Sequence, residues 1–139
     1  MFRRILIAND GSEGGARALT AAIALARSHK AALHMVTVEE MPRFPTTIDE
    51  VEEEKTGAAD RLEPIVRSAK TQARTARVRI VPHIVSGHTV PSILGLIERE
   101  KCDLLVVGFM GHSALYNRLI GSTTDRLVEL APCPVLVVK

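Results

Sequence analysis

Ile5-Leu6-Ile7-Ala8-Asn9-Asp10-Gly11-Ser12 is the stretch that decides how the chain begins to fold. Four consecutive apolar residues are typical of a strand that is covered on both faces, and Asp-Gly is typical of a turn. Ser12 is a suitable N-cap, and apolar residues recur at helical spacing from Ala16 to Ala26. The stretch therefore predicts a buried strand over 4–9, a turn and an Ala-rich helix.

The same alternation of strand and helix continues to the end of the chain. We expect further strands at 31–38, 77–85, 103–107 and 134–138, and helices at 49–73, from Thr89, and at 122–130. Pro64 should kink or interrupt the second helix, and Thr89 is a candidate N-cap for the third. This order predicts an α/β fold, a three-layer α/β/α sandwich with a parallel sheet and right-handed crossovers.

Composition limits the class of protein. The length of 139 residues, with 46% hydrophobic and 24% charged residues, fits one domain over residues 1–139. Aromatic residues make up only 3% and the net charge is only +2, so we expect no nucleic-acid partner. No run approaches the roughly 20 apolar residues of a membrane span. Cys102 and Cys133 form no CxxC pair, and a cytoplasmic location is expected.

Two groups of residues are expected at the edge of the sheet where the strands end, which is where open α/β sheets bind ligands. Asp10 follows the first strand, and its carboxylate suits ribose hydroxyls or a base. Glycines follow the fourth strand, and a helix N-terminus that favours phosphate comes next. Together they predict a nucleotide site without a GxxxxGK[ST] or GxGxxG motif. The residues after the fourth strand are Gly108, Gly111, Gly121, Ser122, Thr123 and Thr124.

Simpler interpretations of these residues remain open. Asp10 can be only a turn former, the glycines can serve loop geometry, and Ser122 can merely cap its helix. The histidines show no HxxxH or HExxH spacing, so no metal site is expected. A redox role for the two cysteines is less common than an unreactive one. The loop around 39–47 is a candidate to close over a ligand.

The spacing of the glycines resembles a known family. Gly108, two residues, Gly111, nine residues and then Gly121-Ser122 form the G-2x-G-9x-G-[ST] pattern of universal stress proteins that bind ATP. The segments 5–12, 33–36, 103–108 and 133–138 resemble that family's strands in the expected order, so the resemblance covers the whole chain.

The resemblance implies a five-stranded parallel, Rossmann-like sheet in the order 3-2-1-4-5 and a site for ATP with Mg²⁺. Asp10 would contact the nucleoside, Ala8 matches a small residue beside it, and Met35 would pack near adenine. The family often has Ser or Thr and then a basic residue or His where this chain has Phe109 and Met110. Backbone groups are therefore expected to hold the phosphates there. Residues around ribose and phosphates would be Gly108, Gly111, Gly121, Ser122 and Thr124.

Three functions follow as hypotheses. The first is a cytoplasmic ATP-binding module of the stress response. The second is a slow enzyme that hydrolyses ATP or transfers phosphate, although no general base or suitably placed arginine is evident. The third is an interaction module that binds no nucleotide. Here an exposed apolar edge strand invites pairing, and the resemblance implies an antiparallel homodimer through Val135, Leu136, Val137 and Val138.

Overall fold

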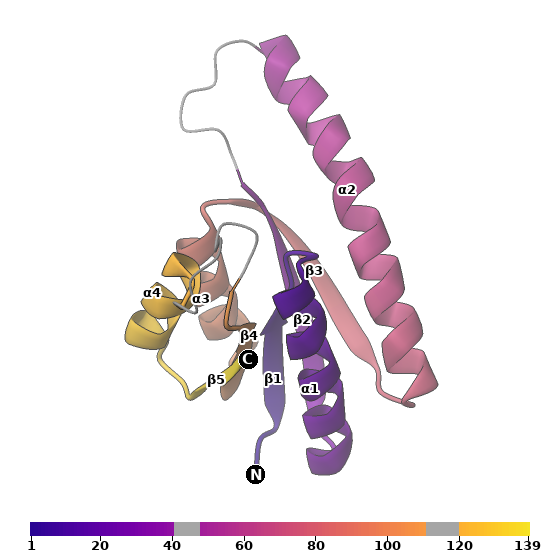
Figure 1. Cartoon of the computed structure of the whole chain (residues 1–139), viewed down its shortest axis with the longest axis vertical. Helices are drawn as coiled ribbons and strands as arrows, with labels where there is room; N and C mark the ends of the chain where they lie inside the picture. The colour runs from indigo at the N-terminus through magenta and orange to yellow at the C-terminus, as the bar shows by residue number, and fades with distance from the viewer. Residues whose placement is uncertain (41–47, 111–119) are drawn as a thin grey trace.

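The computed structural model describes residues 1–40, 48–110 and 120–139, and for residues 48–59 it describes the backbone alone. Gly111 and the loop residues 41–47 lie outside the described residues. Strands and helices alternate along the described chain (Figure 1). The elements are β1 (Arg4–Ala8), α1 (Glu13–His29), β2 (Ala32–Glu40), α2 (Ile48–Thr75), β3 (Ile80–Gly87), α3 (Thr89–Glu100), β4 (Leu104–Gly108), α4 (Ser122–Leu130) and β5 (Val135–Val138).

The strands form one parallel sheet in the order β3-β2-β1-β4-β5. Helices α1 and α2 cover one face, and α3 and α4 cover the other (Figure 1). The three layers, the parallel sheet and the strand order that were expected from the sequence are confirmed. The order reverses between β1 and β4, because the chain moves outward from β1 first through β2 to β3 and later through β4 to β5.

Strand β1, at the centre of the sheet, is buried because both of its faces are covered. Ile5 and Ile7 point into the core with α1 and α2, while Leu6 points into the core with α3 and α4. All three side chains have no solvent-exposed surface. Each contributes about 1.5–3 kcal/mol through burial, which explains how an aliphatic chain with few aromatic residues maintains a stable sheet.

The starts of two helices follow different rules. At α1 the expected cap is present, because Ser12 Oγ accepts a hydrogen bond from Gly15 N at 3.1 Å. At α3 the prediction that Thr89 is the N-cap is wrong: the cap is His88, and its side chain makes no capping bond. The Thr89 hydroxyl instead donates to Glu40 Oε1 at 2.7 Å, which ties α3 to the end of β2.

The region between α2 and β3 also differs from expectation. Helix α2 runs through Pro64 as one helix, so the proline does not interrupt it. Strand β3 begins at Ile80 rather than Arg77, since Arg77 takes a positive φ of 60°. The turn is closed by Val78 N, which donates to Ala73 O at 2.9 Å. The residues at the start of the expected strand therefore belong to the turn and connection that follow α2. No helix in the described ranges is both long and apolar enough to cross a membrane.

Candidate functional site

A cavity of about 650 Å³ opens beyond the carboxyl ends of β1, β2 and β4. It lies at the point where the strand order reverses, which is the usual ligand position in open α/β sheets. Of the expected site residues, the cavity is lined by Ala8, Asp10, Gly108, Gly121, Thr123 and Thr124. The structure thus brings together residues that are more than 100 positions apart in the sequence.

The turn after β1 is held by its own side chains. Asn9 Oδ1 accepts from Gly11 N at 3.0 Å, and Asp10 Oδ1 accepts from both Ser12 N and Ser12 Oγ. Gly11 has φ +80°, a conformation that favours glycine. Asp10 is therefore a turn former, as one interpretation held, and it also lines the cavity. The turn fixes this carboxylate at the centre of the sheet edge.

Close packing against α1 requires a glycine at position 108. A Cβ at this position would lie 2.7 Å from the backbone of Gly14 in α1, and a Cβ on Gly14 would lie 2.2 Å from Met110 O. The start of α1 and the end of β4 therefore touch backbone to backbone. The sequence suggested that Gly108 leaves room for a ligand, but the space of its missing side chain is filled by α1.

The N-terminus of α4 faces the same cavity. Its N-cap is Gly121, which makes no side-chain capping bond, so the first N–H groups of the helix have no side-chain acceptor at the cap. The buried hydroxyl of Thr124 donates to Gly108 O at 2.8 Å and holds α4 against β4. Thr123 lines the cavity, whereas Ser122 is exposed and does not. These features suit an anion at the helix start.

The opposite side of the cavity is formed by β2 and α2. Leu62 and Ile65 of α2 line it together with Thr37 of β2. Met35 is fully buried in the core beneath α1 and α2 and is not among the lining residues; its Sδ lies 3.7 Å from Asn9 Nδ2. Sequence reasoning missed Thr37, although a threonine just before the charged end of an apolar strand is a usable signal.

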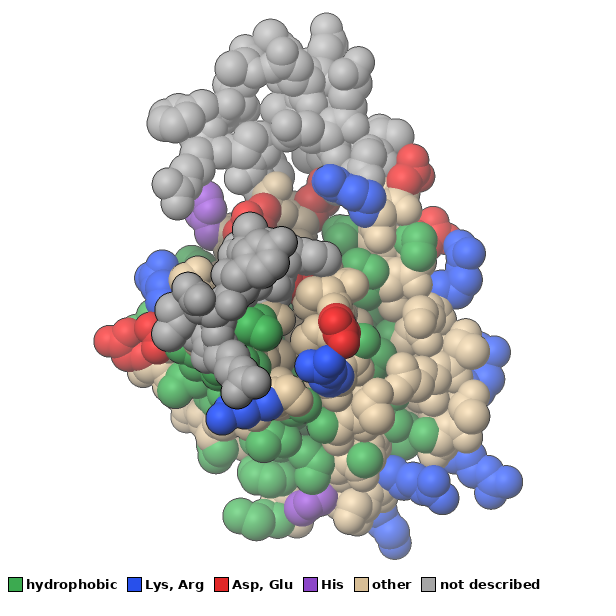
Figure 2. All heavy atoms as spheres, viewed as in Figure 1, with side chains coloured by type: hydrophobic (Ala, Val, Ile, Leu, Met, Phe, Trp, Pro, Cys, Tyr) green, Lys and Arg blue, Asp and Glu red, His purple; other side chains and the backbone are tan. Residues whose placement is uncertain are grey.

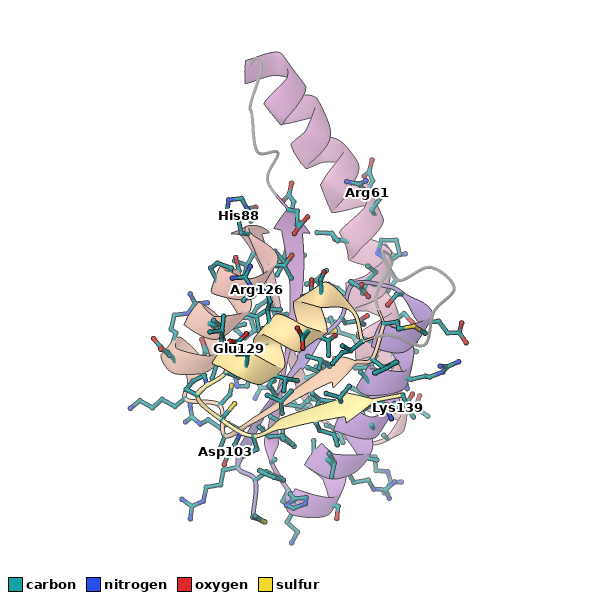
Figure 3. All side chains as sticks on the ribbon, turned by 60° about the vertical axis from the view of Figure 1, so that its left-hand side comes forward. Arg61, His88, Asp103, Arg126, Glu129 and Lys139 are labelled. Atoms are coloured by element: carbon teal, nitrogen blue, oxygen red, sulfur yellow. The ribbon has the colours of Figure 1, made fainter. Side chains whose placement is uncertain are left out.

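The charges around the cavity are mainly acidic. Asp10, Glu39 and Glu40 line it, and Arg61 of α2 is the one basic side chain among the described lining residues. Arg61 projects from α2 above the sheet (Figure 3). Glu39 Oε2 accepts from Ser86 Oγ at 2.9 Å, so this carboxylate joins β2 to β3. Figure 2 shows basic side chains gathered elsewhere, at the lower right over the ends of α1 and α2.

Groups with a shifted pKa lie outside this cavity. Burial, followed by the nearby His83, lowers the pKa of His34, whose Nδ1 lies 2.9 Å from His83 Nε2. Burial raises the pKa of Cys102 and of Cys133, whereas backbone hydrogen bonds from Arg4 and Arg3 outweigh burial and lower the pKa of Asp103. None of these four lines the cavity.

Comparisons with known proteins agree with this arrangement. The model of the universal stress protein family matches residues 1–139. A universal stress protein of Thermus aquaticus is 35% identical over 141 residues, covering 100% of both chains. The solved structure of universal stress protein UspA from Lactobacillus plantarum superposes with a TM-score of 0.91 at 25% identity, covering 99% of this chain and 97% of that chain.

A second solved structure is informative about ligands. It is a universal stress protein in complex with cAMP, with a TM-score of 0.77 at 26% identity, and the match covers 99% of this chain and 97% of that chain. Three findings point to the same family: the family model matches the full length, the Thermus aquaticus protein is 35% identical, and the fold is shared. The chain belongs to the universal stress protein family.

Proposed function

We propose that the chain binds adenine nucleotides, ATP with Mg²⁺ among them, in the cavity at the end of β1 and β4, and that it acts in the cytoplasm as a module of the stress response. The observation that carries the proposal is the meeting of the Asp10 turn and the α4 N-terminus in one cavity of about 650 Å³. That volume is in the range of small-molecule sites. The complex of a similar protein with cAMP supports the adenine nucleotide class.

Each side of the cavity has a separate task. Backbone N–H groups at the start of α4 bind phosphate oxygens, because the helix dipole adds partial positive charge there. Asp10 accepts hydrogen bonds from the nucleoside, whose base lies toward Leu62 and Ile65. Mg²⁺ takes oxygen ligands and would neutralise phosphate charge when bound; besides the phosphate oxygens, the cavity offers it the Asp10 carboxylate at the end of β1, the strand beside β4.

Two measurements test this function. Protein purified without added nucleotide should release adenine nucleotide on denaturation, detected by mass spectrometry, or should bind ATP with Mg²⁺ in calorimetry. Gly121→Val should abolish binding, because the new side chain occupies the start of α4 where phosphate would lie. Gly95→Ala is the matched control, since a Cβ at Gly95 meets nothing within 4 Å. Absence of binding by the unmodified protein, or full binding by Gly121→Val, would contradict the proposal.

We also propose that two chains pair through β5. Leu136 of β5 and Val128 and Leu130 of the adjacent α4 are large apolar side chains, and they are 38%, 48% and 46% exposed. Strand β5 is an edge strand beside β4. An edge with apolar residues favours pairing with a second copy.

A further inference from the structure

We propose that Thr37 is a specificity-determining residue of the cavity, and that its hydroxyl forms a hydrogen bond with the polar edge of the bound nucleobase. This inference rests on the proposed nucleotide function, which it makes more specific. Three observations carry it: the hydroxyl is buried, it lacks a partner among the described residues, and Thr37 lines the cavity.

The burial of Thr37 makes its unpaired hydroxyl notable. Thr37 is 1% exposed, and its Oγ1 is the one buried side-chain polar atom in the described residues without a hydrogen-bond partner. Two other threonines at this edge of the sheet are paired: Thr124 donates to Gly108 O, and Thr89 donates to Glu40. A buried polar group that lacks a partner lowers stability, so its presence in a cavity wall calls for a ligand that completes the bond.

The position of Thr37 indicates that its hydroxyl meets the nucleoside end of the ligand rather than the phosphates. Side chains alternate along β2, so Thr37 points to the same face of the sheet as Met35, the face covered by α1 and α2. Leu62 and Ile65 of α2 line the cavity with it. The α4 N-terminus lies beyond β1 and β4, on the other side of the sheet's centre. Phosphate at α4 therefore directs the nucleoside toward β2.

Chemistry favours the base over the ribose at this place. Apolar side chains such as Leu62 and Ile65 suit the flat faces of a purine, whereas ribose hydroxyls need several polar partners. A threonine hydroxyl both donates and accepts, so it matches either an exocyclic amino group or a ring nitrogen. Asp10 remains on the ribose side of the cavity, next to the end of β1.

Thr37→Val tests the inference because valine has nearly the same shape and lacks the hydroxyl. In the free protein this change removes an unpaired polar atom, so the thermal midpoint should rise by about 3 °C. The affinity for ATP with Mg²⁺, measured by calorimetry, should fall by about tenfold. Most substitutions lower both stability and binding, so opposite changes are the signature of a hydroxyl that is reserved for a ligand.

Two further variants and one further ligand complete the design. Thr37→Ser keeps the hydroxyl and should retain the affinity for ATP. Thr20→Val on α1 removes a hydroxyl that already accepts a hydrogen bond from Gln72 Nε2. The thermal midpoint of this variant should therefore not rise, and its affinity for ATP should not change. Ribose 5-triphosphate has the sugar and phosphates without the base. Its affinity should be equal for Thr37→Val and the unmodified protein.

The outcomes separate this inference from the proposed function. If the unmodified protein binds no adenine nucleotide, both fail. If it binds ATP and Thr37→Val binds equally well, only the role of Thr37 is overturned. A lower midpoint for Thr37→Val would show that the hydroxyl is already paired in the free protein. An equal loss of affinity for ribose 5-triphosphate would move the contact from the base to the sugar and overturn the assignment.

Discussion

Asp103 ties the beginning of the chain to the beginning of β4. Its carboxylate accepts hydrogen bonds from Arg3 N at 2.9 Å and from Arg4 N at 2.9 Å, at the end of the sheet opposite Arg61 (Figure 3). Partial burial acts to raise the pKa of this carboxyl, but the backbone hydrogen bonds from Arg4 and Arg3 outweigh it and hold the pKa below 3.8. The charged form therefore stabilises the fold.

Asp103→Asn should lower the free energy of unfolding by about 1 kcal/mol at pH 7, because the hydrogen bonds to a charged acceptor become weaker. The folded pKa lies below the unfolded value, so the contribution of Asp103 is present above about pH 4 and disappears as the pH falls through the folded pKa. Urea unfolding of both proteins at pH 7 and pH 3 measures this. A difference that persists unchanged at pH 3 would contradict the role of the charge.

His34 is a second titrating group, and its ring lies against that of His83. Their rings are stacked with centroids 5.2 Å apart, and burial, then His83, lowers the pKa of His34 below 6.5. The other charged groups that act on His34 are Glu100, which raises its pKa, and Arg4, which lowers it. The folded state thus favours neutral His34, while the unfolded chain takes up a proton near pH 6.5.

Stability should therefore fall as the pH drops below about 6.5, where the unfolded state binds more protons than the folded state. His34→Gln removes the titrating group and should reduce this slope. Urea unfolding between pH 7.5 and pH 5.5 measures it, with His88→Gln as the control because His88 is exposed and its side chain makes no capping bond. Equal slopes for His34→Gln and the unmodified protein would exclude His34 as the source.

The cysteines should react slowly in the folded protein. Burial, followed by the nearby Cys133, raises the pKa of Cys102 to about 11, and burial also raises the pKa of Cys133. Reaction needs the thiolate, so Cys102 should resist a thiol reagent at pH 8 while Cys133, which is less buried, reacts first. Labelling of native and unfolded protein with Ellman's reagent measures both rates. Rapid labelling of Cys102 in a Cys133→Ser variant would contradict this.

At the scale of elements, α1 and β4 make a close backbone contact at the edge of the cavity. Gly108→Ala places a Cβ 2.7 Å from the backbone of Gly14, and backbone atoms have no alternative rotamer. We expect a loss of about 2 kcal/mol or more in the free energy of unfolding. Gly95→Ala should instead be neutral or stabilising, because its Cβ meets open space on α3. Chemical denaturation compares the two, and equal stability would contradict a close contact at Gly108.

The sequence predicts the elements better than their ends. Runs such as Leu104 to Val107 are long and apolar enough to identify buried strands, and the strand ends then bring Asp10 and Gly108 together. The pattern misplaces the start of β3, because Arg77 to Ile80 alternates like a strand although the positive φ of Arg77 belongs to the turn after α2. Such an ending depends on tertiary packing of α2, which a local pattern does not contain.

The site was predictable only in part for a related reason. Asp10 and the glycines stand beside recognisable turns, so their positions follow from topology. Thr37 lies inside a strand, and its importance depends on the missing hydrogen bond, which becomes visible only when its surroundings are built. The packing role of Gly108 likewise depends on Gly14, which is 94 residues away in the chain. Contacts between residues so far apart in the chain cannot be predicted from the spacing of residues within a local sequence pattern.

At the scale of the whole molecule, the proposed pairing surface lies next to the proposed nucleotide site. Helix α4 lines the cavity with Thr123, Thr124 and Leu127, while Val128 and Leu130 on the same helix are exposed. A second chain on β5 and α4 would therefore contact an element that also holds the ligand. We expect the solution mass to be near twice 15.1 kDa if β5 pairs with its copy.

The hydrogen bonds of β5 show which residue tests this pairing. The carbonyl of Pro134 accepts from Leu105 N of β4, and that of Val138 accepts from Phe109 N just after β4. By alternation, Leu136 also turns its backbone groups toward β4, while Val137 turns its N–H outward. Val137→Pro removes that outward donor and should give a monomer in light scattering. Val137→Ala shortens the same side chain but keeps the N–H, and it should remain a dimer. A dimer that survives Val137→Pro would place the contact elsewhere than the edge of β5.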